Sequence, residues 1–248
     1  MTPSPSTESV DTERRRGRIA GLAALASVAC WFAALELANA SGGRGSAINP
    51  GASLGQPTPL NRARELLDFH AGVTDQTLAT AFRCAGLMLS AAVGVYVYQL
   101  VRARRPDLSR WMLLSALVGA FLVAGATLFG YFALEHVANV FVSSGARTTT
   151  RAQHLIDTSG RLRAAAIFDL VSRLAFAFWI GLASLEMMRV GLLDRFLCYW
   201  GFGACGALVL LPIGDALFIG WLGSLGVLAL GYWPGGRPEA WRAVQIAR

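Results

Sequence analysis

The sequence is poor in charge and contains no lysine. Only 15% of its 248 residues are charged, whereas about 25% is usual in a soluble domain. All 22 basic residues are arginines, and hydrophobic residues make up 54% of the chain. Such a chain cannot cover a water-facing surface of its size, so an ordinary soluble domain is excluded. The preference for arginine over lysine is typical of a coding sequence rich in G and C, and we expect no nucleic-acid partner.

The motifs of the common enzyme classes are also missing from the sequence. It has no H-E-x-x-H, no G-x-S-x-G and no glycine-rich phosphate loop. Its four cysteines form no C-x-x-C pair and have no histidine beside them, which is typical of small buried hydrophobic residues. They are Cys30, Cys84, Cys198 and Cys205. We therefore predict no enzymatic activity, no catalytic residue, no cofactor and no metal site.

Long apolar runs dominate what is present. A helix that crosses a bilayer needs about 20 apolar residues to span about 30 Å of hydrocarbon. Six runs reach or approach this length: about 19–40, 80–101, 111–135, 164–187, 196–213 and 216–233. They predict an all-α fold, a polytopic transmembrane helix bundle of about six spans. The last two runs are short and are joined by "LPIGD", so five spans are the alternative if this pair forms a re-entrant segment.

The arginines predict the orientation of these spans. Thirteen of them lie in segments that share one side of the membrane, and seven lie in the segments of the other side. The arginine-rich segments are 1–18, 102–110, 188–195 and 234–248; the others are 41–79, 136–163 and 212–215. Because cytoplasmic loops are rich in arginine and lysine, both termini are predicted to be cytoplasmic, in a multi-pass protein of the plasma membrane.

The chain is predicted to contain one folded domain. Residues 1–18 form a polar tail expected to be disordered, 19–233 a single transmembrane helical domain, and 234–248 a cytoplasmic tail. The first span also resembles a signal peptide, because "ANA" at 38–40 fits a cleavage site. Its length and the interruption by Glu36 favour an uncleaved anchor.

Two outer loops contain helical patterns. In "TPLNRARELLDFH" (58–70), Thr58 and Pro59 can begin a helix, and Arg64 and Asp68 can pair four residues apart. The apolar face is expected to comprise Leu60, Ala63, Leu66, Leu67 and His70. This helix is expected either on the membrane surface or as a lid packed on the other helices. The second loop (143–163) predicts a shorter helix that ends at Gly160.

Small residues recur every four positions within two spans. Gly86, Ser90 and Gly94 follow this spacing in one of them, and Ser115 and Gly119 in the next. Such ladders allow the backbones of membrane helices to approach closely. They predict compact packing of these spans.

Ionisable residues within the apolar runs are the candidate functional residues. Charged groups in a span are costly and are commonly functional. The candidate intramembrane polar network consists of Glu36, Arg83, Glu135, His136, Asp169 and Arg173. In "AIFDLVSRLAF" (166–176) the last two are four residues apart and can form an ion pair on one helix face. Such a network either holds helices together or binds a transported solute; the local pairing of charges favours the first.

The C-terminal third resembles a known group of proteins. "GLLDRF" (191–196) and "WPGGRPEAW" (233–241) are similar to the G-L-L-x-R-F and W-P-G-G-R-P-x-x-W patterns of uncharacterised actinobacterial multi-pass membrane proteins. The resemblance covers a fifth to a quarter of the chain and implies a lineage, with no known activity.

These observations together predict a non-enzymatic structural or regulatory component of the membrane. The alternative is a small-solute or ion transporter or channel that uses the intramembrane charges. The expected partners are the lipid bilayer and anionic headgroups, which Arg237, Arg242 and Arg248 would meet at the inner surface. The sequence does not identify a protein partner.

Overall fold

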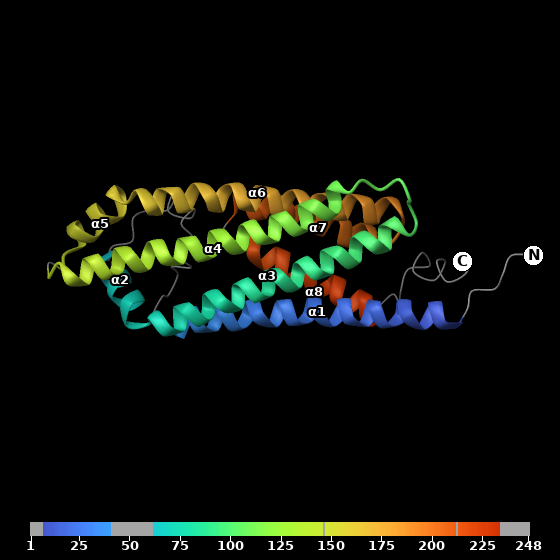
Figure 1. Cartoon of the computed structure of the whole chain (residues 1–248), viewed down its shortest axis with the longest axis horizontal. Helices are drawn as coiled ribbons and strands as arrows, with labels where there is room; N and C mark the ends of the chain where they lie inside the picture. Colours follow the sequence, from blue (N-terminus) through green and yellow to red (C-terminus); the bar gives the residue numbers. More distant parts are fainter. Residues whose placement is uncertain (1–6, 41–61, 146, 212, 234–248) are drawn as a thin grey trace, which may run out of the picture. The chain divides into compact units, whose positions relative to one another are not determined.

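The computed structural model describes residues 7–40, 62–145, 147–211 and 213–233. These residues form eight α-helices and no β-strand (Figure 1). The helices are α1 (Thr7–Ala40), α2 (Arg62–Ala71), α3 (Val73–Arg102), α4 (Trp111–Ser143), α5 (Thr149–Thr158), α6 (Gly160–Arg189), α7 (Arg195–Leu210) and α8 (Gly214–Leu230). The predicted all-α fold is confirmed.

Four helices are long and apolar enough to cross a membrane. They are α1, α3, α4 and α6, with mean hydropathies between 1.7 and 2.2 over their most apolar stretches. The apolar helices α7 and α8 have only 16 and 17 residues, which is about 24 and 26 Å at 1.5 Å per residue. The structure therefore supports a membrane protein with four long candidate spans, and the predicted total of six stays a prediction.

Several helices extend beyond the apolar runs that predicted them. Helix α1 begins at Thr7, although residues 1–18 were expected to be disordered. Extending an existing helix adds one hydrogen bond for each residue fixed, so polar residues next to a stable span can join it at low cost. For the same reason α3 begins at Val73 and α4 ends at Ser143, seven or eight residues outside the predicted spans.

The chain forms two compact units. The first unit comprises residues 1–29, 86–121 and 173–248, and the second comprises residues 30–85 and 122–172. The four long helices contribute one part to each unit, whereas α7 and α8 belong to the first unit and α2 and α5 to the second.

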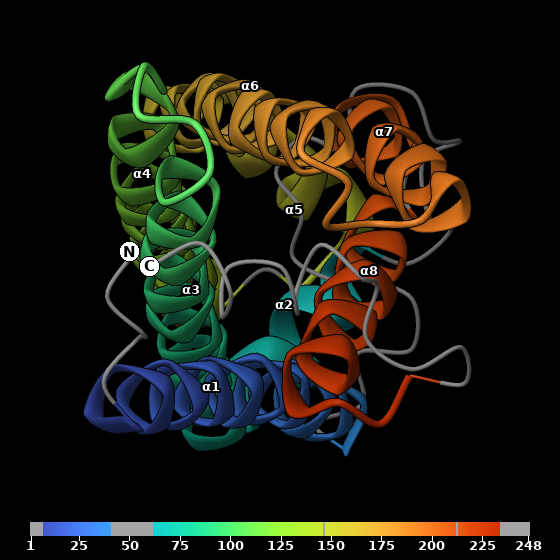
Figure 2. The same cartoon turned by 90° about the vertical axis from the view of Figure 1, so that its right-hand side faces the viewer.

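Aromatic side chains form the core of the first unit. In this unit α7 and α8 lie side by side (Figure 2). The rings of Phe176 and Phe218 are 5.0 Å apart, and those of Trp179 and Trp221 are 6.1 Å apart, in edge-to-face arrangements that join α6 to α8. All four side chains are at most 1% exposed.

Two of the predicted small residues lie at close helix contacts of this unit. A Cβ atom at Gly94 would be 2.8 Å from Cβ of Ala116, and one at Gly119 would be 2.9 Å from Cα of Phe176. The absence of a side chain at Gly119 thus allows α4 to pack directly against the backbone of α6.

The turn between α6 and α7 is fixed at both ends. Gly191 has a positive φ of 69°, and the amides of Gly191 and Leu192 donate to the carbonyls of Met188 and Met187, which closes the end of α6. The Asp194 side chain accepts a hydrogen bond from the amide of Leu197 at 2.8 Å and caps the start of α7. The "GLLDRF" segment is therefore a helix stop followed by a helix start.

In the second unit the short helices form a lid over the end of α4. Helices α2 and α5 pack on each other, and their buried residues join those of α4 in one apolar cluster. The cluster consists of Ala63, Leu66, Phe69, Tyr131, Val137, Ala138, Phe141 and Ala152. The lid alternative for α2 is thus confirmed, although Thr58 and Pro59 lie outside the described residues.

Two details of the lid differ from the sequence prediction. Phe69 takes the buried position expected of His70, which is exposed and hydrogen-bonds the Asn139 side chain at 3.0 Å. The larger apolar side chain is the one removed from water, since burial favours apolar area. Gly160 begins α6 instead of ending α5, whose C-terminal cap is Ser159.

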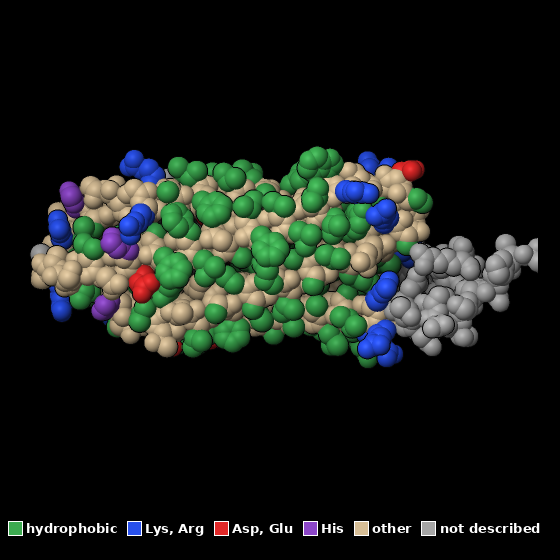
Figure 3. Space-filling view, in the orientation of Figure 1, with side chains coloured by type: hydrophobic (Ala, Val, Ile, Leu, Met, Phe, Trp, Pro, Cys, Tyr) green, Lys and Arg blue, Asp and Glu red, His purple; other side chains and the backbone are tan. Residues whose placement is uncertain are grey.

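Hydrophobic side chains cover the surface of the long helices. On α4 the exposed ones run almost from end to end, and green side chains follow the same helix in the space-filling view (Figure 3). They are Trp111, Leu114, Val118, Phe121, Leu128, Phe129, Phe132 and Val140. An apolar surface of this length is unsuited to water and typical of contact with lipid.

Candidate functional site

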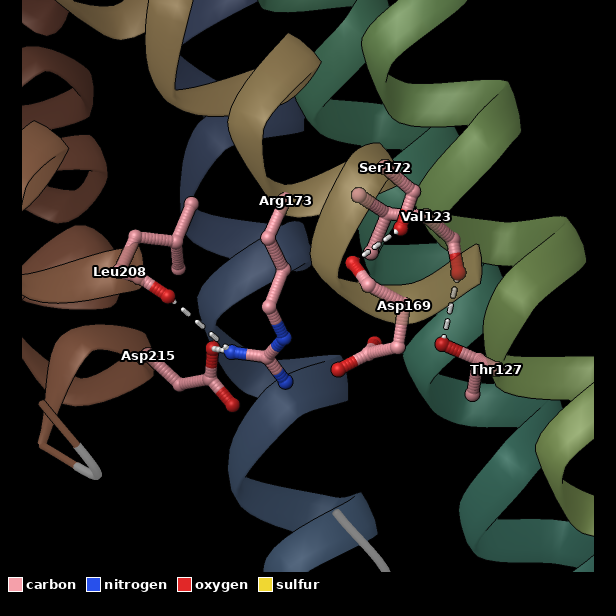
Figure 4. Close-up of polar contacts among 7 residues, drawn as sticks. All are labelled: Val123, Thr127, Asp169, Ser172, Arg173, Leu208 and Asp215. Atoms are coloured by element: carbon pink, nitrogen blue, oxygen red, sulfur yellow. Dashed lines mark hydrogen bonds and ion pairs between the residues drawn. The ribbon is translucent and has the colours of Figure 1, made fainter. Parts of the chain in front are cut away.

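The clearest charge pair in the first unit joins Arg173 of α6 to Asp215 of α8. Arg173 Nη1 lies 3.2 Å from Asp215 Oδ1, and the two side chains are 17% and 32% exposed. The same nitrogen donates to the backbone carbonyl oxygen of Leu208 in α7 at 3.5 Å (Figure 4). One guanidinium therefore contacts two further helices.

The position of each partner explains why a cation suits this place. Leu208 lies in the last turn of α7, where carbonyl groups lack helical partners and the helix dipole is negative. Asp215 lies in the first turn of α8, where the dipole favours a carboxylate. The positive charge of Arg173 thus offsets the negative end of the α7 dipole. It also pairs with the Asp215 carboxylate, which the positive end of the α8 dipole stabilises.

Arg173 lies near the middle of its helix. It is about 20 Å from the first residue of α6 and about 24 Å from the last, at 1.5 Å per residue. The turn between α7 and α8 is therefore held at the level of mid-α6. The sequence singled out Arg173 but not Asp215; a single acid inside the apolar segment "LPIGDALFIGW" was the signal available.

Asp169 lies one helical turn before Arg173 and is 6% exposed (Figure 4). Its backbone carbonyl accepts a hydrogen bond from the hydroxyl of Ser172, which is fully buried, at 2.8 Å. The sequence predicted Asp169 as the carboxylate partner of Arg173. The structure pairs Arg173 with Asp215 of α8, which lies 42 residues later in the chain.

Arg83 belongs to the second unit and lines a small cavity. Its guanidinium carbon is 6.0 Å from the centre of the Trp31 ring, within the range of a cation–π contact. The cavity has a volume of about 20 Å³ and lies between α1, α3 and α4. Its lining residues are Ala38, Gln76, Ala79, Thr80, Arg83, Thr127 and Tyr131.

The other predicted network members are less buried than Asp169. Glu36 of α1 and His136 of α4 are exposed, and Glu135 is half-buried. All three belong to the second unit. Exposed ionisable groups are suited to the ends of spans, where they can reach water or headgroups.

A second ionic cluster, which the sequence analysis did not identify, surrounds Glu186 of α6. Its two carboxylate oxygens lie 2.6 Å from Arg105 Nη1 and 2.7 Å from Arg189 Nη1, and its side chain is 11% exposed. The spacing of Glu186 and Arg189 was a visible signal, but Arg105 is 81 residues away in sequence. The cluster ties the segment between α3 and α4 to the end of α6.

Side chains that commonly bind metal ions are not clustered in the described part of the chain. No group of three or more histidine, cysteine, aspartate or glutamate side chains there is placed to hold a metal ion. The four cysteines are free thiols.

Comparison of the chain with models of protein families, with curated proteins and with solved structures finds no match. The site residues must therefore be interpreted from their own geometry.

Proposed function

We propose that the chain is a six-span protein of the plasma membrane with cytoplasmic termini, and that it acts as a non-enzymatic structural or regulatory component. The short helices α7 and α8 would be the fifth and sixth spans. The arginine distribution supports this orientation, since the exposed Arg102, Arg105 and Arg110 lie around the connection between α3 and α4. On this topology Arg102 and Arg110 would meet anionic headgroups, whereas Arg105 pairs with Glu186. The actinobacterial lineage stays a prediction.

The observation that carries the structural role is the engagement of Arg173. A guanidinium poised for a transported solute would be expected to keep its donors directed at that solute. Arg173 instead directs one nitrogen at both Asp215 and the Leu208 carbonyl, on the two helices of a hairpin. This arrangement favours a latch that fixes the hairpin on α6.

An experiment on Arg173→Gln separates the two roles. The latch requires that the variant be less stable in detergent, while proton and chloride flux per folded molecule in proteoliposomes stays at the wild-type value. Arg64→Gln is the control, because that arginine lies on the lid helix with its side chain 76% exposed. A variant that keeps its stability but changes flux would contradict the structural role and support transport.

The polar cavity beside Arg83 favours a second candidate function, a small-solute or ion transporter. A charged residue that lines a cavity within a span is a common feature of transport pathways. Measurable flux in wild-type proteoliposomes that Arg83→Gln abolishes, with folding unchanged, would establish this alternative.

A further inference from the structure

The cavity at Arg83 has the size and composition of a binding site for one small polar molecule. A void of roughly 10–15 Å³ is enough for one water molecule, and this cavity measures about 20 Å³. Five of its seven lining residues are polar, and they come from two different helices, α3 and α4. Empty cavities in proteins are apolar, whereas polar ones hold ordered water.

Three hydroxyl groups among the lining residues already use their hydrogens. Thr80 donates to the Gln76 carbonyl at 2.8 Å. Thr127 donates to the Val123 carbonyl at 2.8 Å, as Figure 4 shows. Each hydroxyl has one hydrogen and two lone pairs. These two threonines therefore have lone pairs left for a ligand and no hydrogen.

The hydroxyl of Tyr131 also has its hydrogen in an existing hydrogen bond. It lies 2.7 Å from the Thr77 hydroxyl, which donates its own hydrogen to the Val73 carbonyl at 2.7 Å. Tyr131 must then be the donor to Thr77, because the single hydrogen of Thr77 is already used. The hydroxyls of Thr80, Thr127 and Tyr131 can thus serve the cavity only as acceptors.

Two further lining side chains are polar: the Gln76 amide can both donate and accept, whereas Arg83, which is charged, is a donor. Arg83 carries five N–H groups and no acceptor, and the lining contains no aspartate or glutamate. A ligand that matches both kinds of group accepts hydrogen bonds from the guanidinium and donates them to hydroxyl oxygens. A halide ion accepts only, so it would leave the lone pairs of the three hydroxyl oxygens without a donor.

We propose that this cavity is a hydration site for Arg83: one water molecule accepts from the guanidinium and donates to two of the three hydroxyl oxygens. Water can make these three hydrogen bonds while the hydroxyls keep their present ones. The bound water would add to the Trp31 ring as a favourable contact of the Arg83 charge in a helix that is apolar enough to span a membrane. This inference is independent of the Arg173 latch.

The matched pair Thr127→Val and Thr158→Val tests the site. Both threonines donate to the carbonyl four residues earlier, but Thr158 is exposed and does not line the cavity. Loss of one hydrogen bond to the bound water should raise the unfolding equilibrium constant roughly 2- to 13-fold for Thr127→Val beyond the effect of Thr158→Val. Equal effects of the two substitutions would overturn the proposal.

The identity of the ligand is tested on the full-length wild-type protein. A high-resolution structure in chloride-free buffer should show one density peak between Arg83 and the hydroxyls, and the melting temperature should be the same in chloride, bromide and gluconate. Absence of the peak would refute the site. A halide-dependent melting temperature, with bromide at the position of the peak, would refute water and assign an anion site.

Discussion

The pair formed by Arg173 and Asp215 provides the sharpest test of how the helices are held together. We consider Arg173→Gln, Asp215→Asn and the double substitution. Arg173→Gln removes the ion pair and the bond to the Leu208 carbonyl, whereas Asp215→Asn leaves an uncharged oxygen acceptor at 3.2 Å from the guanidinium. Arg173→Gln is therefore expected to be the more destabilising of the two single changes.

The expected magnitudes follow from the burial of the pair. Hydrogen bonds to charged groups contribute about 1.5–3 kcal/mol, so Arg173→Gln should lower the free energy of unfolding by about 2 kcal/mol. Polar contacts between membrane helices average about 0.6 kcal/mol and reach about 1.7 kcal/mol. With side chains 17% and 32% exposed, the pair should have a coupling energy of about 1 kcal/mol.

The assay is reversible unfolding in mixed detergent micelles, followed by helical circular dichroism. The control cycle is Arg64→Gln with Asp68→Asn, a pair on α2 whose closest atoms are 3.7 Å apart and whose side chains are 76% and 38% exposed. Exposed pairs of this spacing contribute about 0.3–0.5 kcal/mol. Equal coupling in the two cycles, or coupling near zero for Arg173 and Asp215, would refute the latch.

Two further pairs of substitutions, one pair in each unit, test the packing by the same unfolding measurement. Gly119→Ala should destabilise by about 1–3 kcal/mol, because the new Cβ atom would meet the backbone of Phe176, which cannot turn away as a side chain can. Gly203→Ala, which has open space around it, should be neutral or stabilising by up to about 1 kcal/mol, and an equal loss at both glycines would contradict this account. In the lid, Phe69→Ala should cost about 3–5 kcal/mol, whereas His70→Ala should cost under about 1 kcal/mol; the reverse order would mean that the lid does not pack as described.

The sequence predicted the helical fold because membrane helices satisfy their backbone hydrogen bonds locally and have apolar side chains all round. The apolar runs identified the end of α3 and the start of α4 to within one residue, but not the start of α3 or the end of α4. A helix has no reason to stop where its side chains become polar, so Val73 and Ser143 lie well outside the predicted spans. The α2 lid was one of two expectations, since an amphipathic face can be buried equally well by lipid or by protein.

The candidate site was predictable only in part, because its contacts are not local. Spacing along one helix suggested Asp169 for Arg173, while Asp215 is 42 residues away. Likewise, the spacing of Glu186 and Arg189 is visible in the sequence, but the position of Arg105 depends on how the connection between α3 and α4 folds back. Pairing across helices requires tertiary structure, which periodicity does not provide.

The separation of Arg173 from Asp215 also has a consequence for synthesis of the chain. At about 5–20 residues per second, a ribosome makes the Asp215 carboxylate about 2–8 s after Arg173. Helix α6 ends at Arg189, so it is completed within this interval, before the Asp215 carboxylate exists. The latch between α6 and the α7–α8 hairpin can therefore form only after α8 has been made, and a chain truncated before α8 would lack it.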